Sequence, residues 1–373
     1  MKEPLSQEIP KFDLSSTSSE ESSMIRRENG DLSERYERFD DFFSDRPEDL
    51  RICIVTHPTP DPDAIGSALG LSFLLEERYG YQCDIYYDGQ VSHPQNQTEI
   101  NVLDIRLRSV EDFEEEKYST FVAVDTTPIN TGRMQGLIET WHATFDHHKT
   151  EAEQPVTDIR STGSCSAIIW DYLNHFGVDF ASEKGIIAAT ALLFGVINDT
   201  DNLLKDNITE LDLKAHAELV RHIDRKKFHA IVNHPLPPYL FDLRALAADN
   251  MVNEASILIS YLGILSDKRR DALPIIADEF LRMEGVETVV VFAMIDHSIH
   301  ASVRSRNSSV NVHQFCQKVF GPEYAGGKYG MGAAKVPIGF LFSPEDDQEL
   351  REQLSEFAKD TITRRIIRHL SGA

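Results

Sequence analysis

The first part of the chain alternates short apolar runs with stretches whose apolar residues recur at helical spacing. Runs rich in Val, Ile, Phe and Tyr are typical of strands, and an apolar residue at every third or fourth position is typical of a helix. The predicted elements are strands at 51–57, 83–87, 120–125 and 142–148, a helix over about 64–79, a polar loop after the second strand and a short helix over about 134–140. Strands separated by helices predict a parallel sheet with crossover helices on both faces.

The same patterns divide the chain into domains. Two further helices, over 165–176 and 186–200, complete the first domain, and the proline-containing stretch NHPLPPYLF marks a boundary. Beyond it, strands and helices predict a smaller α/β domain around a mixed sheet. The predicted parts are an acidic, Ser-rich disordered tail (1–32), an α/β parallel-sheet domain (33–235), a linker helix (236–252) and a second α/β domain (253–373).

The composition bounds the class of protein. With 373 residues and 41% hydrophobic side chains, the chain is long enough for two cores. It has no window near the roughly 18 uninterrupted apolar residues of a membrane span, and its first residues lack the pattern of a secretory signal. The four cysteines are far apart, which argues against a disulfide framework or a thiolate zinc site. We expect a soluble, cytoplasmic protein without a membrane partner.

The charge limits the ligand. The 37 basic and 61 acidic residues give a formal net charge of −24, which is unfavourable for binding long nucleic acid through its phosphates. If the substrate is a nucleotide, we expect it to be small and to be held by local cationic groups and metal ions.

Side chains that can bind a cation lie at the carboxyl ends of the predicted strands, where α/β sheets bind ligands. They are His57, Asp61 and Asp63 after the first strand, Asp125 after the third, Asp146, His147 and His148 after the fourth, and Asp199 at the end of the helix over 186–200. A lone aspartate in such a place is usually a turn or cap residue, and Asp201 competes with Asp199. Together, however, these side chains suit a pair of Mn²⁺ ions, with Mg²⁺ or Fe²⁺ as alternatives.

Four motifs carry a specific resemblance. HPTPDPDAIGS, VAVD, DHHK and GVINDTD, in this order, resemble the motifs of the DHH phosphoesterases, and the similarity covers about residues 50–345. The segments SVRS (302–305) and AGGKYGMGAAK (325–335) are similar to the DHH-associated C-terminal domain. Two-domain members of this size resemble nanoRNases and pAp phosphatases. The resemblance thus implies a catalytic domain over 33–235 and a substrate-binding domain over 253–373.

The resemblance also implies roles for the candidate residues. One Mn²⁺ ion is bound by His57, Asp61 and Asp125, and a second by Asp63, Asp125, His147 and Asp199. Asp125 then bridges the ions, and a hydroxide held between them is the nucleophile. His148 acts beside the metals as a catalytic hydrogen-bond donor or phosphate contact, and Asp146 orients it or the backbone.

Substrate contacts are implied mainly in the second domain. The predicted contacts are Arg304, Ser305, Gly326, Gly327 and Lys328, with Ser164 at the start of the helix over 165–176. Arg304 is predicted to bind the terminal phosphate, because a guanidinium binds phosphate through two parallel hydrogen bonds. Family members usually carry GGGH followed by AAG, whereas GGKYGMGAAK has no histidine, and Lys328 or Lys335 is the candidate replacement.

These inferences leave several functions open. The leading hypothesis is a Mn²⁺-dependent phosphoesterase that hydrolyses short RNA oligonucleotides to mononucleotides and acts on 3′-phosphoadenosine 5′-phosphate (pAp). A cyclic-dinucleotide phosphodiesterase is the alternative, indicated by the missing loop histidine. A pyrophosphatase shares the first domain, but Arg304 and the Gly-Gly loop argue against it. The alternative of another class is a non-catalytic nucleotide sensor. The resemblance also implies a homodimer paired through the first domain.

Overall fold

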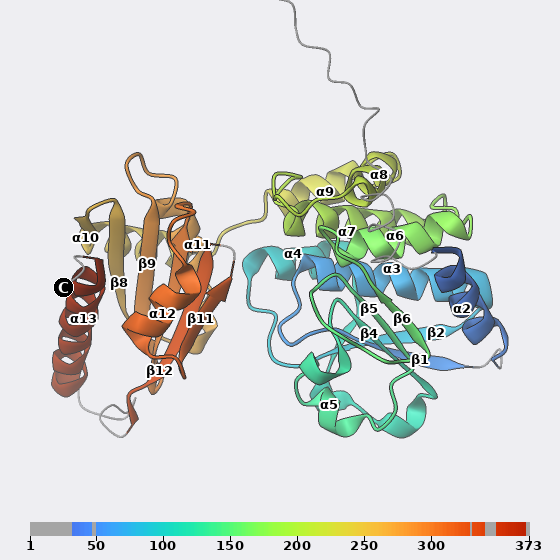
Figure 1. Cartoon of the computed structure of the whole chain (residues 1–373), viewed down its shortest axis with the longest axis horizontal. Helices are drawn as coiled ribbons and strands as arrows, with labels where there is room; N and C mark the ends of the chain where they lie inside the picture. Colours follow the sequence, from blue (N-terminus) through green and yellow to red (C-terminus); the bar gives the residue numbers. More distant parts are fainter. Residues whose placement is uncertain (1–31, 47–49, 329, 340–347, 371–373) are drawn as a thin grey trace, which may run out of the picture. The chain divides into compact units, whose positions relative to one another are not determined.

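The structure is a computed structural model that describes residues 32–46, 50–328, 330–339 and 348–370 (Figure 1). They form two compact units, one up to His234 and one from Pro235 onward, with residues 92–94 grouped with the second. The predicted acidic tail lies outside the described residues except for Leu32, which begins the first described helix.

The first unit contains a parallel sheet and its connecting helices. In chain order its elements are α2 (Leu32–Ser44), β1 (Arg51–Val55), α3 (Pro62–Tyr79), β2 (Gln82–Tyr87), α4 (Pro94–Leu103), β3 (Leu107–Ser109), η1 (Val110–Asp112), η2 (Glu115–Lys117), β4 (Thr120–Val124), η3 (Pro128–Asn130), α5 (Met134–Leu137), β5 (Ala143–Asp146), β6 (Val156–Ile159), α6 (Cys165–His175), α7 (Glu183–Asp199), α8 (Glu210–Leu219) and α9 (Arg225–Val232).

The sheet of this unit has the order β3-β2-β1-β4-β5-β6, and every neighbouring pair is parallel, which confirms the predicted parallel sheet. The chain builds outward from β1 to β3 and then returns to the other side of β1 with β4. The strand order therefore reverses between β1 and β4, and ligands of open α/β sheets bind outside the carboxyl ends of the strands at such a point.

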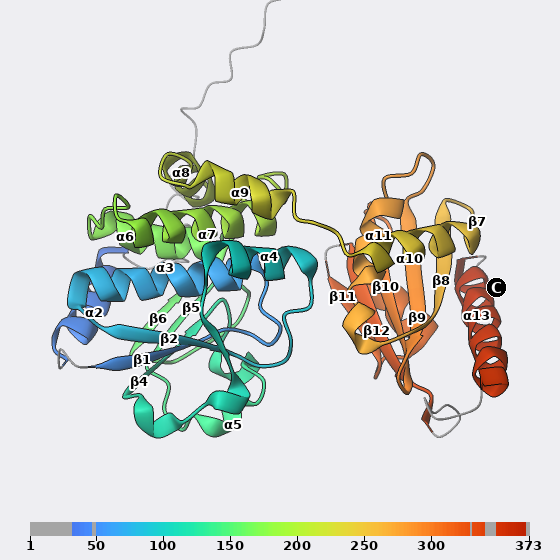
Figure 2. The same ribbon diagram turned by 180° about the vertical axis from the view of Figure 1, so that it is seen from behind.

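The two faces of this sheet are covered differently. The long helices α3, α6 and α7 cover one face, with α8 and α9 beyond them, while α5 lies on the other face (Figures 1 and 2). The first face holds the larger core, which includes Phe39, Leu74 and Phe145. On the second face, Met134 of α5 packs with Tyr86 in a smaller core. The sequence predicted crossover helices on both faces, but the long helices cover one face only.

Helix α4 occupies part of the segment predicted as a polar loop, and that prediction is wrong. The buried side chains of α4 include Asn96, Glu99 and Leu103, which follow the spacing of one helical face. Two of these three side chains are polar, so an apolar pattern did not reveal the helix.

Glycines allow α3 and α7 to pack closely. A Cβ atom on Gly66 would lie 2.6 Å from the carbonyl oxygen of Ala191, and one on Gly195 would lie 3.0 Å from the Cα of Asp63. A larger residue at Gly66 would therefore push the two helices apart. This close approach brings Asp63, in the first turn of α3, next to the end of α7, which carries Asp199.

The second unit contains a mixed sheet. Its elements are α10 (Pro238–Asp249), β7 (Val252–Glu254), β8 (Ile257–Leu265), η4 (Asp267–Arg269), α11 (Ala272–Phe280), β9 (Thr288–Ile295), β10 (Ser298–Ser305), α12 (Val312–Phe320), β11 (Ala325–Lys328), β12 (Met331–Pro337) and α13 (Gln348–Leu370). The strand order is β11-β12-β10-β9-β8-β7, and only β8 and β9 are parallel to each other.

Helices cover both faces of the mixed sheet. Helices α10 and α11 lie on one face, and α12 and α13 lie on the other (Figures 1 and 2). Leu240, Leu243 and Ala247 of α10 are part of the core of this unit. The segment predicted as a linker helix therefore packs within the second unit. Among the helices that the structure describes, none is both long enough and apolar enough to cross a membrane.

Candidate metal centre and substrate cavity

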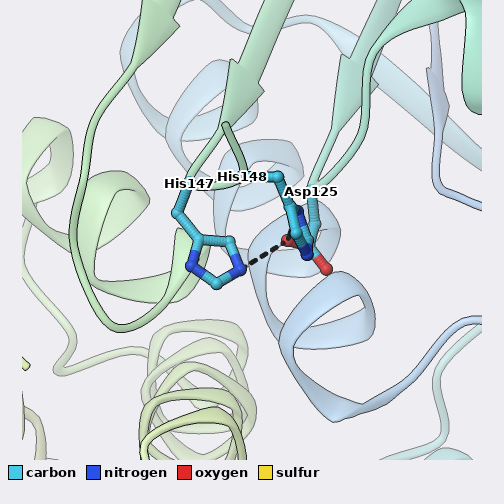
Figure 3. A group of neighbouring side chains, drawn as sticks. All are labelled: Asp125, His147 and His148. Atoms are coloured by element: carbon cyan, nitrogen blue, oxygen red, sulfur yellow. Dashed lines mark ion pairs between the residues drawn. The ribbon is translucent and has the colours of Figure 1, made fainter. Parts of the chain in front are cut away.

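The predicted ligands of the first unit come together at the carboxyl ends of its central strands. They are His57 and Asp61 in the loop after β1, Asp63 in the first turn of α3, Asp125 after β4, His147 and His148 after β5, and Asp199 at the end of α7. Figure 3 shows the ring of His147 directed at the carboxylate of Asp125, with His148 beside it. The site lies where the strand order reverses, as expected for this type of sheet.

One group of ligand atoms forms around His57. Its Nε2 atom lies 3.7 Å from Oδ1 of Asp61 and 3.5 Å from Oδ2 of Asp125. The three side chains offer ligand atoms that all lie within 4.8 Å of one another. This is the set predicted for the first ion.

A second group forms around His147. Its Nε2 atom lies 3.1 Å from Oδ2 of Asp199 and 3.8 Å from Oδ2 of Asp63. It also lies 3.4 Å from Oδ1 of Asp125. The two oxygens of Asp125 therefore face different groups, one towards His57 and the other towards His147. Asp201 is exposed, so Asp199 is the one of the two competing aspartates that reaches the site.

The backbone holds Asp125 in an uncommon conformation. Its φ angle is 55°, in the left-handed region that few residues other than glycine adopt, and its N–H donates to the carbonyl of Phe145 over 2.8 Å. The side chain is only 2% exposed, and Oδ1 has no hydrogen-bond partner among the described residues. A buried oxygen without a partner is costly unless a ligand or ion satisfies it.

Asp61 and Asp63 also stabilise helix ends. Oδ1 of Asp61 accepts hydrogen bonds from the N–H groups of Asp63 and Ala64 and so caps α3. The two oxygens of Asp63 accept from the N–H groups of Cys165 and Ser166, over 2.7 and 2.8 Å, at the start of α6. These contacts fix the carboxylates in place before any ligand binds.

The two metal-facing histidines are oriented by carbonyl groups. Nδ1 of His57 lies 2.9 Å from the oxygen of Pro58, and Nδ1 of His147 lies 3.1 Å from the oxygen of Thr162. A carbonyl can only accept, so Nδ1 of each ring carries a proton. Nε2 of each ring thus faces the carboxylates, where a neutral ring would offer its lone pair to a metal ion.

Asp146 orients His148, as predicted. Oδ1 of Asp146 accepts from the Nδ1 of His148 over 2.8 Å and from the backbone N–H groups of His147 and His148. Asp146 is buried, whereas the side chain of His148 is 40% exposed. The remaining nitrogen of His148 is therefore available at the mouth of the metal centre.

The crowded carboxylates affect each other's protonation. Burial, followed by the charge of Asp63, raises the pKa of Asp125 well above its ordinary value. Burial, with Asp199 and Asp61 acting in the same direction, raises the pKa of Asp63 to about 6. A divalent cation would reverse these shifts, because it favours the ionised carboxylates. The mixed nitrogen and oxygen donors, together with the unpartnered oxygen of Asp125, fit such a cation.

A buried glutamate near this centre was missed in the sequence. Glu99 of α4 is fully buried, and neither carboxyl oxygen has a hydrogen-bond partner among the described residues. Burial, with the charges of Asp61 and Asp63 adding to it, raises its pKa well above the ordinary value. The signal that could have found it is the helical spacing of Asn96, Glu99 and Leu103.

In the second unit, Arg304 borders a cavity of about 620 Å³ on the side of the sheet covered by α11. Its Nε donates to Asp278 over 2.7 Å, and its Nη1 donates to Ser302 over 3.0 Å. Gly326 and Lys335 also border this cavity. We refer to this candidate site as the substrate cavity, because substrate contacts were predicted for several residues that border it.

Several predicted substrate contacts have other roles. Ser305 lies on the opposite side of β10 from Arg304, and its hydroxyl is hydrogen-bonded to Thr288 over 2.8 Å. Gly327 and Lys328 do not border the cavity. A Cβ atom on Gly327 would lie 2.5 Å from the carbonyl oxygen of Met331, so this glycine allows β11 to pair closely with β12.

Ser164 is likewise occupied within the first unit. It is fully buried, its hydroxyl donates to Asp212 over 3.1 Å, and the same oxygen accepts from the N–H of Ala167. The start of α6 is already filled by the carboxylate of Asp63. The predicted phosphate contact of Ser164 is therefore not supported by this geometry.

Two histidines lie beside the glycine-rich segment, although the segment itself has none. His300 of β10 borders the substrate cavity and is paired with Lys335 of β12. His313 of α12 accepts a hydrogen bond from the N–H of Gly327 over 3.3 Å. His300 could have been found from the alternation of His300, Ser302 and Arg304 along one face of a strand.

Comparison with known proteins identifies the family. Residues 51–196 match the family model described as the DHH family, N-terminal domain. Residues 51–196 are therefore identified as a DHH-family domain. The members of this family are phosphoester hydrolases. The matched segment contains every predicted metal ligand except Asp199, which lies just beyond its end.

Three curated relatives of this DHH protein cover different shares of it. An uncharacterized protein of Methanocaldococcus jannaschii is 33% identical over 83% of this chain and 63% of its own length. A probable manganese-dependent inorganic pyrophosphatase of Streptococcus agalactiae is 27% identical over 45% of this chain and 54% of its own length. The bifunctional oligoribonuclease and PAP phosphatase NrnA of Bacillus subtilis is 28% identical over 46% of this chain and 53% of its own length. The chain thus spans between half and two thirds of the length of these relatives.

A solved structure has the same fold. The crystal structure of an exopolyphosphatase-related protein from Bacteroides fragilis matches with a TM-score of 0.66 and 16% identity, over 89% of this chain and 98% of that chain. At this identity the likeness shows the fold alone, and it confirms the α/β fold class.

Proposed function

We propose that this DHH protein is a Mn²⁺-dependent phosphodiesterase that hydrolyses short RNA oligonucleotides to mononucleotides and also dephosphorylates pAp. The observation that carries the proposal is the position of Asp125, whose Oδ2 lies 3.5 Å from Nε2 of His57 and whose Oδ1 lies 3.4 Å from Nε2 of His147. A carboxylate shared in this way suits two ions held side by side, the arrangement of two-metal phosphoesterases.

The side chains fall into two sets of metal ligands. His57, Asp61 and Asp125 would hold one ion, and Asp63, Asp125, His147 and Asp199 would hold the other. When bound, the ions would neutralise the phosphate charge and lower the pKa of a water molecule that serves as nucleophile. Mn²⁺ is favoured because the donors are imidazole nitrogens and carboxylate oxygens, and because one relative is named as manganese-dependent.

Other residues of the chain would orient the histidine rings and donate a hydrogen bond to the substrate. Pro58 and Thr162 hold the rings of His57 and His147 with their lone pairs towards the site. Asp146 fixes the ring of His148 through Nδ1. In its protonated form, His148 would donate from its other nitrogen to a phosphate oxygen or to the departing ribose oxygen. The substrate cavity, with Arg304 at its edge, would bind the part of the oligonucleotide beyond the scissile bond.

Product release from labelled oligonucleotides tests the proposal. The full chain is incubated with di- to pentaribonucleotides in Mn²⁺ and, separately, in EDTA. We expect mononucleotides only with Mn²⁺, and inorganic phosphate when the substrate is pAp. A folded protein that binds Mn²⁺ but releases no mononucleotide from any length would refute the proposal.

A cyclic-dinucleotide phosphodiesterase is the second candidate. It is favoured by the glycine-rich segment, which lacks the histidine that the family resemblance leads us to expect. Initial rates on c-di-AMP and on linear pApA distinguish the two candidates. Faster opening of the cyclic substrate would replace the first proposal with this one.

A further inference from the structure

The substrate cavity carries cationic side chains at two separate places. Along β10, His300, Ser302 and Arg304 all border the cavity, because alternate residues of a strand share a face. Lys335 of β12 is paired directly with His300. Arg304 lies four residues farther along the strand, which corresponds to about 13 Å. The cavity is thus long, with Arg304 at one end and the pair His300 and Lys335 at the other.

The cations at the His300 end make only loose ion pairs, although the carboxylates of Asp271 and Glu323 also border the cavity. Arg270 borders it and makes loose ion pairs, 3.8 Å from Asp271 and 3.9 Å from Asp267. Lys335 is exposed and has no carboxylate within ion-pair distance in the described part of the chain. At the other end, by contrast, Arg304 is in contact with Asp278 at 2.7 Å.

His300 adds a neutral donor to these cations. The side chain is buried, and burial, followed by the charges of Lys335 and Arg270, lowers its pKa. The carboxylates of Asp267 and Asp296 act in the opposite direction but do not outweigh them. A neutral imidazole has one N–H to donate, and bound phosphate can accept it.

An aromatic ring lies at the edge of the cavity. Tyr324 is 42% exposed, and its carbonyl accepts from the N–H of Lys335 over 2.9 Å, which fixes its backbone to β12. The cavity floor between the two ends consists of small residues, including Ser302 and Ala333, which are paired across β10 and β12. A flat base can therefore lie over the strands and stack on an exposed ring.

We propose that Arg270, His300 and Lys335 form a second anion subsite, which binds one phosphate of a linear oligonucleotide while Arg304 binds another, with a base stacked on Tyr324. We call the three residues the distal subsite. The inference rests on the proposed function and extends it to substrate length. The distance between the two ends exceeds the span of a pyrophosphate group and requires nucleosides between the phosphates. A trinucleotide should therefore bind better than a dinucleotide.

Steady-state kinetics of the full chain with Mn²⁺ test this subsite. The substrates are 5′-phosphorylated di- and triribonucleotides, and the variants are Lys335→Ala and Arg270→Ala. We expect each variant to raise KM for the trinucleotide about tenfold, since it loses one charge-assisted contact, with kcat unchanged. The KM for the dinucleotide should change less than about twofold. Lys328→Ala is the matched control, because Lys328 is exposed nearby but does not border the cavity.

Bis(p-nitrophenyl) phosphate separates this proposal from the proposed function, because it needs the metal centre but is too short to reach both ends of the cavity. Equal increases in KM for the di- and trinucleotide, or none, would overturn the distal subsite while the phosphodiesterase assignment stands. Hydrolysis of this small ester without hydrolysis of any oligonucleotide would also overturn it.

A chain that hydrolyses neither kind of substrate would refute the proposed function instead. The subsite is then tested by equilibrium binding of a fluorescent trinucleotide to the Mn²⁺-loaded chain. The subsite would be supported if Lys335→Ala bound the trinucleotide about tenfold more weakly. The slope of its binding constant against salt concentration, on logarithmic scales, should also fall by about one phosphate contact. Equal binding by the wild type and Lys335→Ala would overturn it.

Discussion

The metal centre of the first unit and the substrate cavity of the second are built in opposite ways. Around the candidate metal centre, Asp61 and Asp63 also hold the ends of helices, and Asp63 and Asp125 are buried. Around the cavity, Lys335 is an exposed residue of β12, and Tyr324, just before β11, is 42% exposed. The candidate metal ligands are therefore tied into the fold of the first unit, whereas the exposed side chains at the cavity of the second unit are less constrained by it.

The largest expected effect is at the shared carboxylate. Asp125→Ala should lower kcat/KM for every substrate by about a thousandfold or more, because neither ion keeps its bridging ligand. Stability in EDTA should change little, since removal of the buried, unpartnered Oδ1 offsets loss of the contact between Oδ2 and His57. Turnover in Mn²⁺ and thermal unfolding in EDTA are measured together, with Asp201→Ala as the nearby control. Substantial turnover by Asp125→Ala would show that the centre works without a bridge.

The next largest expected effect distinguishes the role of the second unit from that of the first. Arg304→Ala should raise KM for oligonucleotides by roughly tenfold to a hundredfold through the loss of charge-assisted hydrogen bonds. Hydrolysis of bis(p-nitrophenyl) phosphate should stay at the wild-type rate, because that ester does not need the cavity. If both activities fell together, the second unit would be acting on the metal centre and the contrast between the units would fail.

A smaller effect distinguishes Asp63, which accepts buried backbone hydrogen bonds, from Asp199, which makes a partly exposed ion pair with Lys205. Asp63→Ala should lower the free energy of unfolding in EDTA by about 1–3 kcal/mol, because the buried N–H groups of Cys165 and Ser166 lose their acceptor. Asp199→Ala should change it by less than about 0.5 kcal/mol. Urea unfolding of both variants checks this, and Mn²⁺ binding should weaken in both. Equal stability of the two would contradict the structural role of Asp63.

The smallest effect is a pH dependence at Glu99. Its folded pKa is raised above the ordinary value of 4.5, so the folded state keeps a proton that the unfolded state releases above that pH. This contribution to stability is therefore complete below 4.5 and is lost as the pH rises towards the folded pKa. Glu99→Gln should remove this loss, so the variant gains stability relative to the wild type between about pH 5 and about pH 8.

Urea unfolding in EDTA at the two pH values measures this difference. The exposed Glu77→Gln is the control, with no expected change between them. A wild type and Glu99→Gln that respond identically to pH would show that Glu99 is not held neutral in the folded protein.

The parallel sheet and the grouping of the candidate metal ligands could be predicted from the sequence because they depend on local patterns. Strand ends are readily found from apolar runs, and a site at the carboxyl ends of neighbouring strands brings His57, Asp125 and His147 together whatever the details of the loops. The pairing of Asp146 with His148 is also local, since only one residue separates them in the sequence.

The rest depends on contacts between distant segments. The start of α6 is filled by Asp63, which lies about a hundred residues earlier, so the predicted role of Ser164 could not be corrected from the sequence near it. The glycine-rich segment is shaped by its own turn and by α12, and the strand register that brings Lys335 beside His300 is not visible in composition. Helix α4 was hidden because its buried face carries Asn96 and Glu99.

The two contacts of Asp63 also limit how such a domain can evolve away from catalysis. A mutation there would remove a candidate metal ligand and weaken the start of α6, so the stability of the domain would fall together with the proposed activity. A descendant that lost its enzymatic role would discard His57 or Asp199 first and keep an aspartate at the position of Asp63. In a newly found homologue, therefore, that aspartate alone is weak evidence of activity, and the presence of His57 and Asp199 is much stronger evidence.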